Sequence, residues 1–274
     1  MIDIEAYFAR IGYAGPRRPD LETLRGVHAR HPAAIPFENL DPLLGRPVSL
    51  DPAALQAKLV AERRGGYCFE QNTLLKAALE ALGFRVTAFA ARVIWMLPAG
   101  RPPNPRAHMV LKVESEGVAH IADVGFGGLL SAAPVPLPDA TADAIGAEQP
   151  VPGGALRLSR DGMFLVLQAR TDGPWQDVYR FTEEPQFPID IELANWFTAA
   201  HPGSRFRNVL MVQRLLPDAR VSLMNRRLVR RPAQGQAQER IIEDAATLEN
   251  VLRETFGIEP PGDLSEVFAR LPPS

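Results

Sequence analysis

The sequence predicts an α+β fold in three regions, because its hydrophobic period changes twice along the 274 residues. Residues 1–83 carry apolar side chains at helical spacing. From Phe84 onward, β-branched and aromatic residues gather in short runs bounded by Gly, Pro or Asp, which is typical of strands. The last part mixes a helix, further strands and two closing helices. We therefore divide the chain into residues 1–83, 84–187 and 188–274.

Four helices are expected in the first region. They cover residues 1–12, residues 21–31, Asp51-Pro52 to Arg64, and about Tyr67 to Leu82. Asp20 and Asp51 precede the second and third helices as N-caps, and Pro52 suits a first helical position. The glycines at 65–66 end the third helix, and Gly83 ends the fourth as a C-cap.

The second region is expected to form an antiparallel sheet or small barrel over about 84–185. Its strand-like segments are 84–96, 108–114, 118–126, 163–170 and 177–181. The span 132–154 is rich in Ala, Pro and Gly and is expected to be an irregular surface loop. The third region should contain a helix at 189–201, strands at 209–216 and 220–231, and helices near 246–256 and 263–270.

Composition excludes several functional classes. Hydrophobic residues make up 46% and charged residues 23%, which is ordinary for a soluble globular protein. The net charge of -2 gives no overall attraction to nucleic acid or to an anionic membrane. One cysteine forms no internal disulfide and anchors no metal-ligand cluster in sequence, so no metal is expected. The N-terminus lacks a signal peptide pattern, and we expect a cytoplasmic protein.

The single cysteine, Cys68, lies in the segment RRGGYCFEQN at residues 63–72. The two glycines allow a tight turn, and the next helix is expected to begin at the cysteine itself. A thiol at a helix N-terminus faces the positive end of the helix dipole, which stabilises negative charge on sulfur. A lone cysteine is otherwise often a small buried apolar residue. Its position here favours a nucleophile.

A thiolate nucleophile needs a base, and five histidines are available. His28 and His31 lie in and at the end of a helix among charged residues, and we expect them to be surface or local structural residues. His201 ends a predicted helix, where a cationic side chain suits the helix C-terminus. His108 and His120 lie on predicted strands. A strand histidine is more often structural than catalytic, so the choice depends on its neighbours.

His108 gains a neighbour if the strands at 108–114 and 118–126 pair through a turn near residues 115–117. Residues 108 and 123 then lie opposite each other, which sets the Asp123 carboxylate beside the His108 imidazole. His120 would pair nearer Leu111, and His120 and Asp123 would lie on opposite faces. Cys68, His108 and Asp123 are therefore the candidate nucleophile, base and orienting carboxylate.

Four segments in order resemble the arylamine N-acetyltransferases over essentially the whole chain. They are IPFENL at 35–40, RGGYCFEQN at 64–72, the His108 strand and DVGFGG at 123–128, and the segment HPGSRFRN at 201–208 matches the same family. The resemblance implies a helical bundle, a β-barrel and an α/β lid, with a cysteine-protease-like Cys-His-Asp core between the first two. It also implies a ping-pong reaction in which acetyl-CoA acylates Cys68 and an arylamine or arylhydrazine then takes the acetyl group.

The same resemblance suggests further site residues. Phe37 is similar to a residue that lines the acceptor pocket, although it is equally well a core aromatic. Phe126 and Gly127 lie in a loop that resembles one beside the active site, and Phe206 is expected to close the cleft. Glu38 and Arg64 resemble a structural ion pair that braces the catalytic turn. These four substrate-side residues and this pair complete the predicted site.

Details of donor binding stay open in the sequence. Met109 follows His108 where many relatives of that family carry a small hydroxyl residue that helps to admit CoA. Arg226, Arg227, Arg230 and Arg231 would suit CoA phosphates, but an arginine run is more often a solvated face. The acceptor amine and the oligomeric state are not specified by the sequence.

Two other functions compete with acyl transfer to an amine. One is hydrolysis by a papain-like or transglutaminase-like amidase with the same three residues. A papain-type oxyanion glutamine would lie six residues before the cysteine, and that position is Glu62. The other is a non-catalytic binding protein on the same fold. Such a protein would have no need to keep Cys68, His108 and Asp123 positioned for catalysis.

Overall fold

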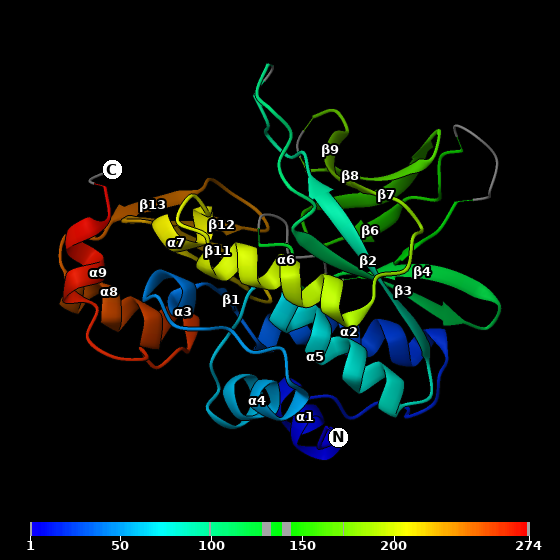
Figure 1. The fold of residues 1–274 in the computed structure, drawn as a ribbon, viewed down its shortest axis with the longest axis horizontal. Helices are drawn as coiled ribbons and strands as arrows, with labels where there is room; N and C mark the ends of the chain where they lie inside the picture. The colour runs from blue at the N-terminus through cyan, green and yellow to red at the C-terminus, as the bar shows by residue number, and fades with distance from the viewer. Residues whose placement is uncertain (1, 99, 128–132, 139–143, 172, 273–274) are drawn as a thin grey trace.

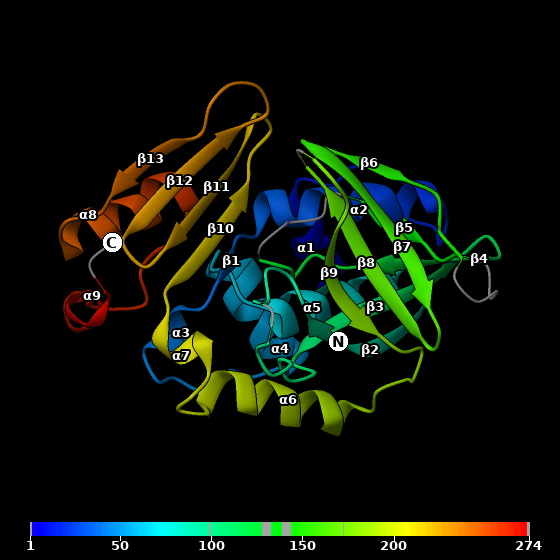
Figure 2. The ribbon, with the colours of Figure 1, turned by 90° about the horizontal axis from the view of Figure 1, so that it is seen from above.

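The computed structural model describes residues 2–98, 100–127, 133–138, 144–171 and 173–272. Its central layer consists of the N-terminal helices, with an eight-stranded sheet on one side and a five-stranded sheet with two helices on the other (Figures 1 and 2). The helix α6, Pro188–Ala200, runs along the outside from one sheet to the other (Figure 2). The predicted α+β fold, with helices, a barrel-like sheet and a mixed C-terminal part, is confirmed.

The first region is mainly helical. Its elements are α1 (Ile4–Ile11), α2 (Leu21–Ala34), β1 (Phe37–Glu38), α3 (Leu40–Leu43), α4 (Pro52–Leu55), the π-helix η1 (Gln56–Ala61) and α5 (Cys68–Ala81). Asp20 and Asp51 cap α2 and α4 by accepting backbone N–H groups, as predicted. The third predicted helix is α-helical only to Leu55 and then widens into η1, and the short strand β1 was not anticipated.

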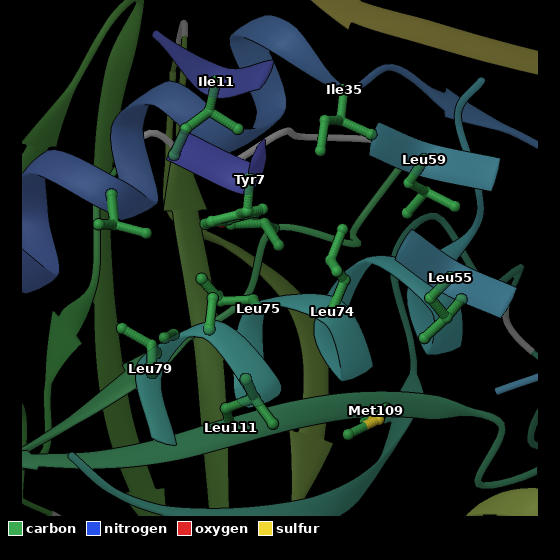
Figure 3. Close-up of a cluster of buried hydrophobic side chains, with 14 of the residues drawn as sticks. Tyr7, Ile11, Ile35, Leu55, Leu59, Leu74, Leu75, Leu79, Met109 and Leu111 are labelled. Atoms are coloured by element: carbon green, nitrogen blue, oxygen red, sulfur yellow. The ribbon is translucent and has the colours of Figure 1, made fainter. Parts of the chain in front are cut away.

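The core of this region forms around α5. Figure 3 shows the leucines of α5 between α1 on one side and strand β3, His108–Ser115, on the other. Leu75 and Leu79 are fully buried, and Met109 and Leu111 of β3 pack beneath them. Because one helix contacts both the N-terminal helices and the sheet, the start of α5 is held rigidly between the first two regions.

The second region forms one antiparallel sheet in the order β5-β4-β3-β2-β9-β8-β7-β6. Besides β3, its strands are β2 (Arg85–Val93), β4 (Val118–Ala122), β5 (Val135–Pro136), β6 (Gln149–Val151), β7 (Gly154–Asp161), β8 (Phe164–Arg170) and β9 (Gln176–Phe181). β5 also contacts β7, so the sheet curls into a nearly closed barrel. The expected loop at 132–154 contains β5 and β6 instead, and residues 139–143 within it lie outside the described structure.

The β3–β4 hairpin has a different register from the predicted one. Glu116 and Gly117 alone form the turn, and both have positive φ, at 52° and 80°. Such a two-residue turn pairs Ser115 with Val118 and Val113 with His120. The predicted pairing of residues 108 and 123 was therefore wrong by two residues.

The two-residue error preserves the face on which each side chain lies. β4 ends at Ala122, opposite Leu111, and Asp123 comes directly after it. Because side chains alternate with a period of two, an even shift leaves His108 and Asp123 on one face as diagonal neighbours. The two side chains consequently still meet.

The third region adds a five-stranded sheet in the order β1-β10-β11-β12-β13. After α6 come α7 (Arg205–Asn208), β10 (Met211–Leu215), β11 (Ala219–Met224), β12 (Arg227–Pro232), β13 (Gln238–Ile241), α8 (Ala245–Val251), the π-helix η2 (Leu252–Phe256) and α9 (Ser265–Arg270). The single strand predicted at 220–231 was wrong, because Asn225 at φ 52° turns the chain between β11 and β12. Pairing of β1 with β10 ties this sheet to the segment that precedes the catalytic turn.

Candidate active site

Cys68 is the first residue of α5 and is 3% exposed. The turn before it is fastened to the β1 segment, since Glu38 N donates to Gly66 O at 3.1 Å and Gly66 N donates to Pro36 O at 3.3 Å. The Gln71 side chain, one turn into α5, donates to Pro36 O at 2.8 Å and Gly66 O at 3.1 Å. The thiol therefore occupies a fixed helix start, as the Gly-Gly pattern predicts.

His108 begins β3 opposite Ala91, and its ring is 3% exposed. Its Nε2 lies 2.7 Å from Asp123 Oδ2. The other ring nitrogen, Nδ1, is then left for the Cys68 thiol, whose interaction with the ring helps to raise the pKa of His108. Cys68 Sγ also lies 3.9 Å from the carbonyl oxygen of Ala107. The structure thus brings together all three residues that the sequence nominates.

Asp123 receives hydrogen bonds from three elements. Besides His108, its Oδ1 accepts from Asn72 Nδ2 at 2.9 Å and from Gly125 N at 2.9 Å. Its own backbone N–H donates to His28 Nε2 of α2 at 3.1 Å. A carboxylate held from several directions has one orientation toward the imidazole, which defines the imidazole tautomer.

The electrostatics of the pair favour the ionised forms. Burial acts to lower the pKa of His108, but the Asp123 carboxylate and the Cys68 thiol outweigh it and raise this pKa to about 10. Burial acts to raise the pKa of Asp123, yet the His108 imidazolium and the bonds from Asn72 and Gly125 lower it. At neutral pH the site therefore holds an imidazolium between a carboxylate and the thiol.

Two residues of this arrangement were missed in the sequence. Asn72 lies one turn after Cys68, and its Oδ1 also accepts from Val124 N at 3.0 Å. The i, i+4 spacing of Cys68 and Asn72 placed both on one helix face, so this signal was available. The expectation for His28 and His31 as surface or local residues was wrong, because both imidazoles are fully buried. Their contacts come from segments distant in sequence, which local pattern does not reveal.

The turn after Asp123 packs closely against α5. A Cβ at Gly125 would lie 2.6 Å from Cys68 Cα, and a Cβ at Gly127 would lie 2.7 Å from the ring of Phe37. Only glycine allows these approaches. The glycines of this loop are therefore required by packing against Cys68 and Phe37, and Gly128 lies outside the described residues.

Aromatic rings surround the thiol and imidazole in two groups. Phe206 packs near Phe37 and Tyr67, with ring centroids 6.4 and 5.2 Å away. Phe126 contacts the His108 ring edge-on at 5.4 Å and Trp95 at 6.0 Å. The predicted substrate-side residues Phe37, Phe126 and Phe206 thus all lie beside residues of the candidate site.

Glu38 and Arg64 belong to a larger group of buried charges. Arg64 lies 2.7 Å from Glu38 and 3.3 Å from Asp41. Lys58 of η1 lies 2.6 Å from both Asp41 and Glu70. Glu70 in turn accepts the Tyr67 N–H at 3.1 Å, immediately before the cysteine. The predicted ion pair is therefore part of a network that reaches the start of α5.

The C-terminal arginine run is largely engaged elsewhere. Arg227 pairs with Glu239 at 2.6 Å, Arg230 pairs with Asp218 at 2.6 Å, and the Arg226 guanidinium lies over the Phe268 ring. These contacts favour the structural alternative over a phosphate site. Among the described residues, no three His, Cys, Asp or Glu side chains are grouped so that they could hold a metal ion. No helix in the described ranges is long and apolar enough to span a bilayer.

Comparison with known proteins gives consistent matches. A family model described as N-acetyltransferase matches residues 20–263. An arylamine N-acetyltransferase of Mycobacterium tuberculosis (strain ATCC 25618 / H37Rv) is 42% identical over 260 residues, which are 94% of this chain and 89% of that protein. The structure of the Mycobacterium marinum arylamine N-acetyltransferase superposes with a TM-score of 0.90 at 38% identity, covering 98% of both chains. The same M. marinum enzyme in complex with CoA also gives a TM-score of 0.90.

Proposed function

The chain belongs to the arylamine N-acetyltransferase family of acyltransferases, and on this premise we propose that it acetylates arylamines and arylhydrazines from acetyl-CoA through an acetyl-Cys68 intermediate. The observation that carries the proposal is the buried His108–Asp123 pair beside a cysteine at a helix start. The M. marinum relative solved with CoA supports CoA as the leaving group.

In the first half-reaction the Cys68 sulfur, as thiolate, attacks the thioester carbonyl of acetyl-CoA. The carbon–sulfur bond to CoA breaks, and the departing CoA sulfur takes the proton held on the His108 imidazolium. The raised pKa of His108, which burial opposes and Asp123 and Cys68 cause, keeps that proton available at neutral pH. Acylation leaves acetyl-Cys68 and a neutral imidazole.

In the second half-reaction the amine nitrogen attacks the acetyl carbonyl of the thioester. His108, now neutral, accepts the proton that the nitrogen loses, and the Cys68 thiolate departs as the amide forms. Asp123 stabilises the imidazolium in both steps and orients Nδ1 toward sulfur. Proton and acyl group thus balance over the cycle, and no metal or prosthetic group takes part.

The remaining residues are proposed to shape the site. Phe37, Phe126 and Phe206 would contact the aromatic acceptor, and Gly127, which packs directly against the Phe37 ring, would hold that ring in place. Glu38 and Arg64 would brace the turn before Cys68. In this division of labour, residues 1–83 supply the nucleophile, residues 84–187 the histidine and aspartate, and residues 188–274 the lid.

Intact mass after incubation with acetyl-CoA alone tests the proposal. Wild type should gain one acetyl group, and Cys68→Ala should gain none. Adding an arylamine such as aniline should remove the adduct and speed CoA release. If CoA release is equal with and without amine, the hydrolase alternative holds; if no adduct forms and amine adds nothing, acyl transfer is wrong.

A further inference from the structure

His28 lies behind Asp123 and is not used by the mechanism described above. It comes from the middle of α2, and its side chain is fully buried. Its Nε2 accepts the backbone N–H of Asp123 at 3.1 Å, across 95 residues of sequence. This contact joins the helical region directly to the residue that orients His108.

The geometry defines the tautomer of His28. A nitrogen that accepts an N–H carries no proton of its own, so in the neutral ring the proton is on Nδ1. Nδ1 has no hydrogen-bond partner on any other described residue. A proton added at Nε2 would point a second N–H at the Asp123 N–H, and the contact would change from bonded to repulsive.

The Asp123 N–H has no strand partner to replace this bond. β4 ends at Ala122, one residue earlier, so the ladder with β3 no longer supplies an acceptor. A buried backbone N–H requires a partner, and His28 provides it. Asn72 and Gly125 bond the carboxylate end of the same residue, so His28 holds the backbone from which that carboxylate extends.

We infer that His28, in its neutral Nδ1–H form, is a positioning residue that acts through the Asp123 backbone on the Asp123–His108 pair. This inference rests on the proposed acyl transfer through Cys68. It assigns a role to α2 in catalysis, because a shift of the Asp123 backbone would misalign the carboxylate and hence the imidazole that faces sulfur.

The surroundings of His28 keep it neutral. The ionisable groups next to it are Asp123 at the end of β4 and His31 on its own helix, which α1 reaches through Tyr7 and Arg10. Burial lowers the pKa of His28 to about 4, against the opposing effects of the Asp123 charge and of its own backbone carbonyl. The acceptor on Nε2 is therefore present at neutral pH.

Two substitutions at His28 distinguish the effect of the hydrogen-bond acceptor from the effect of side-chain volume. His28→Gln places an amide oxygen near the former Nε2, and His28→Met fills similar space without an acceptor. Single-turnover acylation by acetyl-CoA, followed as CoA release without amine, should stay within about threefold of wild type in the glutamine variant and fall at least about tenfold in the methionine variant. His120→Gln, at a buried histidine of β4 that lies outside the site, is the matched control and should leave the rate unchanged.

A spectroscopic readout distinguishes positioning from simple packing. In ¹⁵N-histidine-labelled protein, His28 should show an unprotonated Nε2, and the low-field proton between His108 and Asp123 should be retained in His28→Gln and weakened in His28→Met. Equal rates in the two variants, or a protonated Nε2 in wild type, would overturn the inference. If His28→Met does not fold, the tautomer of wild-type His28 and the acylation rate of His28→Gln still test the inference. If wild type itself forms no acetyl adduct, the proposed function fails, while the tautomer measurement still tests the placement of His28.

Discussion

Buried histidines lie on either side of Asp123, and their pKa values are shifted in opposite directions. On the barrel side, His108 has its pKa raised to about 10 even though burial acts to lower it, because Asp123 and Cys68 outweigh the desolvation. On the helical side, burial lowers the pKa of His28 to about 4 and that of His31 to about 3. All three imidazoles are almost completely removed from solvent.

The difference lies in the partner and not in the degree of burial. His108 bonds a carboxylate side chain directly, at 2.7 Å. His31 lies 2.7 Å from the Tyr7 hydroxyl and 2.6 Å from the Gln71 amide oxygen, both neutral groups. Neutral partners do not recover the hydration energy that a buried cation loses, whereas an opposite charge does. One protein interior therefore holds a charged imidazole, His108, and a neutral one, His28, that both bond the same residue, Asp123.

Asp123→Asn tests this comparison most severely, because it gives His108 a neutral partner like those of His31. The pKa of His108 should fall, and the imidazolium would no longer be retained beside Cys68. Single-turnover acylation should drop by about 10³- to 10⁴-fold, the size expected when a triad carboxylate is neutralised. Asp161→Asn, at an exposed hairpin, is the control. Normal acylation in Asp123→Asn would refute the assignment.

Arg64→Ala tests whether other buried charges also depend on an oppositely charged partner. The change leaves Glu38, which is 1% exposed, without its closest cation. The free energy of unfolding should fall by about 3–5 kcal/mol. Arg230→Ala breaks an exposed pair with Asp218 and should cost no more than about 1 kcal/mol. Similar losses in the two variants, measured by urea denaturation, would show that burial does not govern the strength of these pairs.

In wild type, the pH dependence of the free energy of unfolding should reflect both the lowered pKa of His28 and the raised pKa of His108. The lowered pKa of His28 contributes stability above the ordinary value of 6.5, and that contribution is lost as the pH falls toward about 4. A shift of this size corresponds to about 3 kcal/mol, and His31 acts in the same direction. The raised pKa of His108 contributes stability below 6.5, and that contribution is lost as the pH rises toward about 10.

Urea denaturation between pH 4.5 and pH 9 measures the loss of stability on the acid side and on the alkaline side, which we call the acid and alkaline arms. Carboxyl groups titrate mainly below this window. His31→Gln should flatten the acid arm, and Asp123→Asn should flatten the alkaline arm. Stability that is constant from pH 6.5 down to 4.5 would contradict neutral His28 and His31.

Asn72→Ala should have the smallest effect of the set, because it removes a neutral partner of Asp123. Three hydrogen bonds of the Asn72 side chain would be lost, those to the Asp123 carboxylate and the Met109 carbonyl and the one from the Val124 N–H. The free energy of unfolding should fall by about 1–3 kcal/mol. Thr73, the next residue of α5, makes only a 3.7 Å contact with the Met109 sulfur. Thr73→Ala should therefore lower the free energy of unfolding by less. If the two variants lose equal stability, Asn72 does not support Asp123 as described.

Local signals predicted the elements on which the site is built. The caps at Asp20 and Asp51 and the helix start at Cys68 are decided within a few residues, so the sequence located them correctly. The β3–β4 register was missed because Glu116, which is not a glycine, adopts a positive φ and shortens the turn. The even size of that error is why His108 and Asp123 were still paired.

The long-range contacts around the site were not predictable in this way. His28 meets Asp123 across 95 residues, and Asn72 meets it across 51. Each contact depends on how α2 and α5 pack against the barrel, and that packing is a sum over many side chains. A histidine among charged residues of a helix therefore looked like a surface residue until the neighbouring elements were in place.

The groups available for chemistry can be read from the amino-acid sequence: one cysteine at a helix start, and a histidine and an aspartate on one face of a hairpin. The protonation state of each histidine, in contrast, depends on the folded interior. Charge on a side chain depends on desolvation and on the distance to opposite charges, and both are properties of the packed interior. His108 is an imidazolium because the Asp123 carboxylate bonds it directly, and His28 is neutral because burial outweighs the more distant Asp123 charge while its bonded partner is a backbone N–H.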